Sequence, residues 1–283
     1  MEKLIEPFAY SFMMRAFIVG LIVSLCSSLL GVVLVLKRYS MIGDGLSHAG
    51  FGILAVATAL NIAPLYVSLF GVMLCACFIM LLNERSKFKG DALTALISTG
   101  ALAVGILVSS FGRGSNIDLN SYLFGSILST TNSDVALSGL IGGVVLIYFT
   151  IFYNKIFSLT FDEQFSKACG MNVTLYNIVT AVLTAVTVVI GMRLMGTLLI
   201  SAFLVIPPMC AMRVSKHFKT VLIVSTVISV TLMVMGLYVT YYNNIPTGAT
   251  TVCIGLALFA LLTAIAKVIA LIYKRKAIKN KKQ

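Results

Sequence analysis

The chain has 283 residues, of which 59% are hydrophobic and only 11% are charged, and its formal net charge is +12. Soluble domains have about a quarter of their residues charged, so this composition excludes an ordinary soluble domain and predicts a polytopic membrane protein. The basic residues are spread over short loops and form no recognition module, which argues against nucleic-acid binding.

Hydropathy predicts an all-α protein with about eight to nine transmembrane helices, because one span needs roughly 20 apolar residues. The apolar segments are residues 16–36, 41–60, 64–82, 92–110, 134–153, 173–191, 194–212, 219–240 and 250–273. They use nearly the whole chain, so residues 1–283 are expected to form a single transmembrane domain. Gly and Pro interrupt several segments, so one of them could be re-entrant instead of spanning.

The basic residues indicate how the chain is oriented. Lys37 and Arg38 directly follow the first segment and anchor it, which argues against a cleaved signal peptide. With nine spans, 17 of the 21 Lys and Arg residues fall on one side of the membrane. The positive-inside rule makes that side cytoplasmic. We therefore predict an external N-terminus and a cytoplasmic C-terminus, with a basic tail at residues 274–283 near anionic lipid.

The second segment, SMIGDGLSHAGFGILAVATAL at residues 40–60, carries two ionisable residues. Asp44 and His48 are four residues apart, so they share one face of a helix. A carboxylate in hydrocarbon costs about 3 kcal/mol even on insertion scales, which favours a functional role. Imidazole and carboxylate together suit zinc or manganese. The alternative is a structural pair in which both side chains bind backbone groups.

Motifs for catalysis are missing from the sequence. It has no G-x-x-x-x-G-K-[ST] loop, no H-E-x-x-H and no G-x-S-x-G, and its six cysteines form no C-x-x-C pair. Asp44 is the one acidic residue set inside an apolar segment. We therefore expect no enzyme activity and no permanently bound cofactor.

Four stretches together resemble the zinc/manganese ABC importer permeases, the ABC-3 family. The first is LVLKRYSMIGDGLSHAGFGILA at residues 34–55. The others, in order, are FDEQFSKACGMNV (161–173), GTLLISAFLVIPPMCAMR (196–213) and YYNNIPTGATTV (241–252). The resemblance runs from about Pro7 to Tyr273. The chain departs from the family at Asn243-Asn244, where an Asp is common, and at Pro208, where a second proline is unusual.

The resemblance implies a type II-like ABC importer permease in a bacterial cell membrane. Such permeases act as homodimers, receive metal from an extracytoplasmic metal-binding protein, and are driven by a separate ABC ATPase. The implied cargo is zinc, with manganese or iron next, and Asp44 and His48 are the expected metal ligands. A permease for a siderophore or cobalamin, and a secondary metal transporter that needs no ATPase, are the alternatives.

The polar segment at residues 154–172 is the expected contact with the ATPase. Phe161, Phe165 and Ala168 follow the i, i+4, i+7 spacing, which predicts an apolar stripe on a short helix. With the resemblance, this stripe, together with Asp162 and Gly170, predicts a coupling helix that docks in a groove of the ATPase. The alternative is an amphipathic loop lying on the membrane.

Two further elements are candidates for the transport path or its gate. Pro207 and Pro208 remove two backbone donors, which predicts a break that frees the carbonyls near residues 203–204. Pro246 is expected to start the last helix, with Thr247 as a gate residue. Either element could instead be a turn without metal contact.

Overall fold

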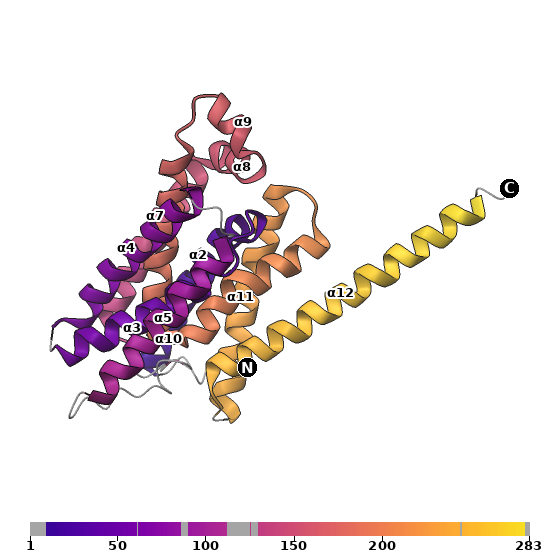
Figure 1. Ribbon diagram of the computed structural model, residues 1–283. Helices are drawn as coiled ribbons and strands as arrows, with labels where there is room; N and C mark the ends of the chain where they lie inside the picture. Colours follow the sequence, from indigo (N-terminus) through magenta and orange to yellow (C-terminus); the bar gives the residue numbers. More distant parts are fainter. Residues whose placement is uncertain are drawn as a thin grey trace.

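The computed structural model describes residues 10–60, 62–85, 90–111, 125, 130–243 and 245–280, with side chains at 84, 85, 90 and 269–280 left undescribed. All regular secondary structure in these ranges is helical, as the hydropathy predicted (Figure 1). The helices are α2 (Ser11–Leu36), α3 (Ile42–Ala59), α4 (Pro64–Arg85), α5 (Gly90–Phe111), α7 (Asn132–Ile151), α8 (Tyr153–Phe161), α9 (Glu163–Ala168), α10 (Val173–Val214), α11 (Phe218–Asn243) and α12 (Thr247–Asn280).

Seven helices in the described ranges are long and apolar enough to cross a membrane. Helix α3 is not among them, and α10 is counted once although it contains two of the predicted segments, 173–191 and 194–212. When α3 is included and the two parts of α10 are counted separately, each of the nine predicted apolar segments corresponds to a helix or an arm of one. Asp44 and His48 lower the mean hydropathy of α3, and Gly196 divides α10.

Helix α10 folds back on itself at Gly196. This glycine has φ 81° and ψ 163°, a conformation open essentially to glycine alone. A straight helix of 42 residues would be about 63 Å long, yet both ends of α10 lie at the same face of the bundle. Val173 closely follows α9, and Phe218, just beyond the other end, stacks on Phe161 of α8. Residues 173–195 and 197–214 are therefore two separate arms.

The expectation that Pro207 and Pro208 break the helix is wrong. The second arm of α10 stays helical through both prolines, which are buried. The carbonyl oxygen of Leu204, which Pro208 deprives of a helical donor, lies against Gly31 of α2. Because Gly31 has no Cβ, the two backbones can approach closely, so the freed carbonyl faces protein.

Polar contacts divide the helix ends into two faces. At the bend face, Arg15 in the first turns of α2 donates to Asn132 at the start of α7. Arg193, three residues before the bend at Gly196, pairs with Asp134 of α7 at the same face. At the α9 face, Lys37 at the end of α2 pairs with Glu163 of α9. Helix α7 therefore runs from the bend face toward the α9 face, and the first arm of α10 runs back, as the nine-span topology predicts.

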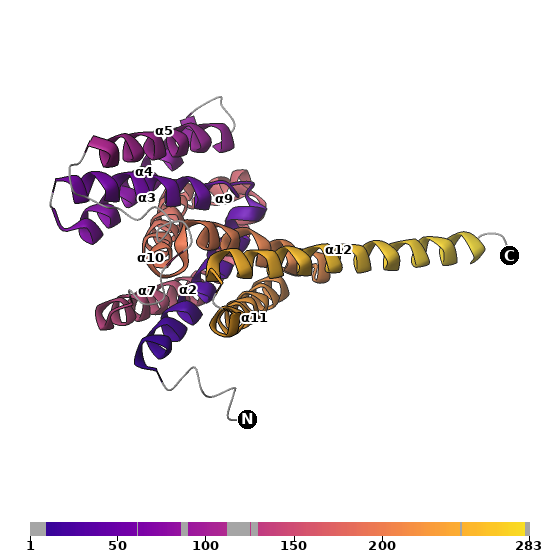
Figure 2. The ribbon, with the colours of Figure 1, turned by 90° about the horizontal axis from the view of Figure 1, so that it is seen from below.

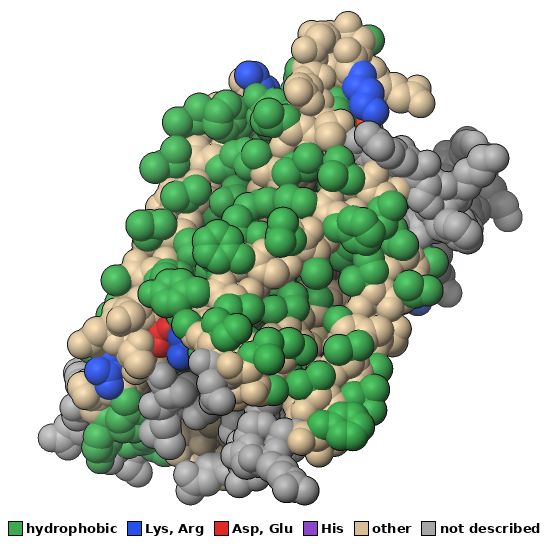
Figure 3. Space-filling model, turned by 60° about the vertical axis from the view of Figure 1, so that its left-hand side comes forward, with side chains coloured by type: hydrophobic (Ala, Val, Ile, Leu, Met, Phe, Trp, Pro, Cys, Tyr) green, Lys and Arg blue, Asp and Glu red, His purple; other side chains and the backbone are tan. Residues whose placement is uncertain are grey.

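Hydrophobic side chains cover the middle of the surface between these faces. Figure 3 shows them across most of the visible side, with Lys, Arg and acidic groups near its two ends. Large apolar residues such as Phe70, Leu74 and Leu140 are well exposed. Such a belt is the surface expected of a protein whose solvent at this depth is lipid.

Helix α12 begins at Thr247, as the sequence predicted, and projects away from the other helices (Figures 1 and 2). Only 11% of its apolar window is buried. Its first turns pack on α11, where Thr251 lies against Gly236. The helix continues to Asn280 and so includes most of the predicted basic tail, 274–283, whose residues 281–283 lie outside the described residues.

Candidate functional site

Glycines allow the neighbouring helices to lie close against α3. At four positions, a Cβ atom would collide with or crowd a neighbouring helix. Gly45 and Gly52 lie against α5, and Gly43 and Gly50 lie against α10. The sequence predicted close helix approach from the small residues around Asp44 and His48, and the packing confirms it.

Asp44 and His48 occupy the sector of α3 that these neighbours leave open. At about 100° per residue, the glycines that contact α5 and those that contact α10 lie on nearly opposite sides of the helix. Ile53, which packs on Gly71 of α4, occupies a third side. Asp44 and His48 lie on the fourth, opposite α4. Within residues 42–52 they are the two positions that are not fully buried.

The two side chains are close enough to share one metal ion. Nε2 of His48 lies 3.5 Å from Oδ1 of Asp44, with 24% of the His48 side chain and 44% of the Asp44 side chain exposed. This separation is long for a charge-assisted hydrogen bond. Two ligands about 2.1 Å from a tetrahedral zinc ion lie about 3.4 Å apart, so the pair has the spacing of a chelating site.

One polar atom of this pair lacks a partner. Nδ1 of His48 is buried and has no hydrogen-bond partner among the described residues. Buried polar atoms are nearly always paired, so the unpaired Nδ1 of His48 is an exception beside the nitrogen that faces Asp44. The described residues contain no group of three or more His, Cys, Asp and Glu side chains that could hold a metal. Asp44 and His48 would therefore need further ligands from neutral oxygens, water or another chain.

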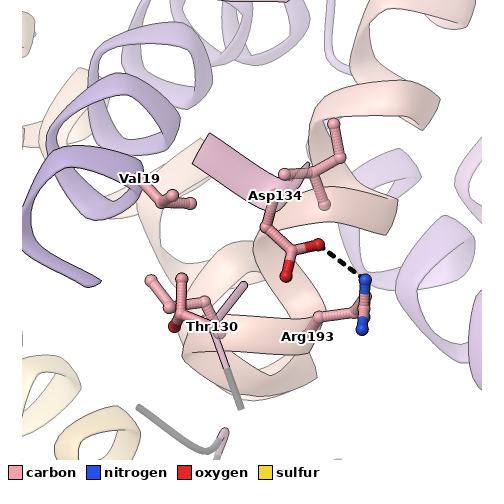
Figure 4. Close-up of a pocket in the computed structure, with 6 residues that line it drawn as sticks. Val19, Thr130, Asp134 and Arg193 are labelled. Carbon is pink, nitrogen blue, oxygen red and sulfur yellow. Dashed lines mark hydrogen bonds and ion pairs between the residues drawn. The ribbon is translucent and has the colours of Figure 1, made fainter. Parts of the chain in front are cut away.

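A pocket at the bend face has a different chemistry (Figure 4). Val19, Thr130, Asp134 and Arg193 line it, and Arg193 Nη1 lies 2.6 Å from Asp134 Oδ1. The other oxygen of Asp134 accepts from the backbone N–H of Thr131, 2.9 Å away, in a capping box at the start of α7. Both carboxylate oxygens have donors, so this pocket is unsuited to a cation and instead ties α7 to α10.

The predicted coupling segment consists of two short helices instead of one. Asp162 has extended backbone angles between α8 and α9, and its side chain accepts from the N–H of Phe165 at 2.9 Å. Phe161 therefore ends α8 while Phe165 belongs to α9, so the expectation of one helical stripe is wrong. Both rings are still about 60% exposed. The break arises because Asp162 is a favourable N-cap.

Gly170 ends helix α9. It has φ 77°, its N–H donates to Lys167, and the N–H of Met171 donates to Ser166. These two bonds form a Schellman motif, which needs a residue in the left-handed region and therefore favours glycine. The loop geometry after α9 is thus fixed by the backbone itself.

Lys37 and Glu163 form a close ion pair at the α9 face, although the sequence indicated only that they were charged residues at a helix end and in a loop. Lys37 Nζ lies 2.6 Å from Glu163 Oε1 and also donates to Asn177 of α10. The spacing along the chain gave no sign of this pairing, because its members are far apart in sequence.

Thr247, the predicted gate residue, is buried at the start of α12. In the described hydrogen bonds it contacts no predicted metal ligand.

Comparison with known proteins agrees with this architecture. Residues 9–267 match the ABC 3 transport family. The manganese import system permease protein ScaB of Streptococcus gordonii is 28% identical, over 88% of this chain and 90% of that protein. The high-affinity zinc uptake system membrane protein ZnuB of Buchnera aphidicola is also 28% identical, over 88% and 96%.

A solved structure, PsaBC from Streptococcus pneumoniae in complex with Fab, has the same fold. It superimposes with a TM-score of 0.80 at 27% identity, covering 92% of this chain and 94% of that one. The helical bundle and the family match span the same part of the sequence. The chain belongs to the ABC 3 transport family, whose members are permease subunits of ABC transporters.

Proposed function

We propose that this chain is the permease of an importer for a divalent first-row transition metal, and that Asp44 and His48 bind the metal in transit. The observation that carries the proposal is the 3.5 Å spacing of these side chains on the one open sector of α3. Asp44 supplies negative charge against the cation, and His48 supplies a borderline-soft nitrogen. Two side-chain ligands bind weakly, which suits a site that must release its cargo.

Zinc is the proposed cargo, with manganese or iron next. Imidazole with carboxylate favours these ions over magnesium, which prefers oxygen ligands and keeps much of its water. The names of the relatives ScaB and ZnuB point to manganese and to zinc respectively, so they support the class of metal without choosing its member.

The energy for import would come from a partner ABC ATPase bound at the α9 face. Phe161 and Phe165 are exposed there beside the fixed turn at Gly170, and an aromatic pair on short helices fits a hydrophobic groove. The proposed complex is a homodimer of this permease, with an extracytoplasmic metal-binding protein on the bend face. The α9 face would be cytoplasmic in a bacterial cell membrane, because the basic residues concentrate there.

The test is uptake of radioactive zinc and manganese by cells that contain equal amounts of each variant. Asp44→Asn keeps the shape of the side chain and removes its charge, while His48→Ala removes the nitrogen ligand. Each change should reduce uptake at least tenfold and leave the amount of permease in the membrane unchanged. His217→Ala, which alters the other histidine in an exposed loop, is the matched control and should transport normally.

Normal uptake by both Asp44→Asn and His48→Ala would return the pair to a structural role. The rival functions have different signatures in the same assay. A permease for chelated cargo would import metal only when a chelator is supplied. A secondary transporter would continue to import metal after the partner ATPase is deleted.

A further inference from the structure

Three helices meet at the ammonium group of Lys37. Lys37 caps the C-terminal end of α2, and its Nζ lies 2.6 Å from Oε1 of Glu163, the first residue of α9. The same Nζ donates to Oδ1 of Asn177, in the second turn of α10. Asn177 Nδ2 in turn donates to Glu163 Oε1 at 3.5 Å. The three side chains close a small network between α2, α9 and α10.

Burial of Lys37 makes this network costly to break. The Lys37 side chain is 6% exposed, while that of Glu163 is 37% exposed. Apolar residues of three helices, Val33, Met80 and Ala181, line the pocket around Lys37. A buried ammonium that loses its carboxylate is costly to the protein, because water cannot replace the partner. Separating Lys37 from Glu163 therefore costs free energy, so a movement of α9 exerts a pull on Lys37.

A hydrogen-bonded turn connects Lys37 to the proposed metal ligands. Tyr39 N–H donates to Leu34 at 2.8 Å, which fastens the turn to α2. Ile42 N–H donates to Tyr39 at 3.1 Å, which fastens it to α3. Arg38, inside the turn that the Tyr39–Leu34 bond closes, has φ 62°, a left-handed conformation that makes the reversal tight. Asp44 lies in the first turn of α3, directly after this junction.

We infer that Lys37 and Glu163 form a strut that transmits movement of α9 to the first turn of α3 and so to Asp44. Both are positioning residues, since the contacts that define the strut join them to each other and to Asn177. The inference rests on the proposed function, in which an ATPase moves α9 and Asp44 binds metal. Without the strut, the ATPase would still bind and hydrolyse ATP, but less of the movement of α9 would reach α3. The specific loss is therefore in metal transported per ATP hydrolysed.

The test uses the full complex of permease, ATPase and metal-binding protein in liposomes, with zinc uptake and ATP hydrolysis measured in the same sample. Glu163→Gln keeps the side-chain shape and removes the charge. It should retain ATPase binding and at least half of the hydrolysis, while zinc transported per ATP falls about tenfold. Glu163→Asp keeps the charge and should give an intermediate ratio. Lys219→Gln, which removes an exposed charge from the same face, should match the unaltered complex.

The results that would overturn this inference differ from those that would overturn the proposed function. If Glu163→Gln leaves the ratio unchanged, or lowers uptake and hydrolysis in parallel, the pair has only a structural role and the inference is wrong. It is equally wrong if the ATPase no longer co-purifies, because Glu163 then acts in docking, or if Glu163→Asp is as poor as Glu163→Gln. Asp44→Asn and His48→Ala in the same liposomes test the metal site itself, and normal zinc uptake by both would contradict the proposed function independently.

Discussion

Gly45 controls how closely α3 can lie to α5 beside the proposed metal ligand. A Cβ at this position would collide with Cγ2 of Thr94, which is itself almost fully buried. Ordinarily, replacing glycine by alanine inside a helix adds about 1 kcal/mol of helix stability. Here the overpacking costs about 1–3 kcal/mol, so the collision should outweigh that gain.

Gly45→Ala should therefore lower the unfolding temperature of the purified permease by several degrees and reduce metal uptake, because Asp44 moves with the displaced helix. Gly100→Ala in α5 is the matched control. A Cβ at Gly100 meets nothing within 4 Å, so that variant should be as stable as the original protein or slightly more so. Thermal unfolding in detergent measures both. Equal unfolding temperatures for the two variants would contradict the packing argument.

At this scale the sequence predicted the contacts that are local along a helix. Asp44 and His48 share a face because of their four-residue spacing, and this needs no tertiary information. The pairing of Lys37 with Glu163 needed the fold, since only packing brings α2 and α9 together. The open sector of α3 was also beyond prediction, because it depends on which neighbouring helices cover the other sides.

Among the elements, the predicted coupling segment, residues 154–172, can be tested directly for its proposed contact with the ATPase. Phe165→Asp places a charge on an exposed ring position, and Gly170→Pro is incompatible with φ 77° and removes the N–H that donates to Lys167. Both changes should release the ATPase and abolish uptake while the spans stay folded. Co-purification of the ATPase from detergent extracts measures this. Lys216→Gln at the same face should bind it normally, and retention by the other two variants would make the segment an ordinary loop.

Two elements differed from the sequence prediction for identifiable physical reasons. The sequence predicted a turn between segments 173–191 and 194–212, and the bend lies close by at Gly196, where the backbone needs glycine. The additional break that was expected at Pro207 and Pro208 is wrong, because the helix continues through both prolines. At this position the chain remains helical, and Gly31 of α2 leaves room for the freed carbonyl of Leu204 at the contact between the two helices. In the coupling segment, the periodicity of Phe161 and Phe165 was read across Asp162, whose capping preference ended one helix and started another.

For the whole molecule, charge and hydropathy together predicted the nine segments, because both depend on the membrane as solvent. Neither charge nor hydropathy predicts which distant segments pack together through glycines or hydrogen bonds. The two faces are now defined by such contacts, Arg193 with Asp134 on one and Lys37 with Glu163 on the other. The distribution of basic residues predicts that the α9 face is cytoplasmic.

Labelling of single cysteines from outside the cell tests that orientation. Ser133, at the start of α7 on the bend face, and Cys169, beside α9, are both exposed. In variants from which the other exposed cysteine, Cys253, has been removed, a membrane-impermeant maleimide should label Ser133→Cys in intact cells. It should reach Cys169 only after the membrane is permeabilised, because the α9 face carries basic residues that the positive-inside rule predicts to be cytoplasmic. Labelling of Cys169 but not of position 133 in intact cells would reverse the orientation and place the proposed ATPase contact on the wrong side.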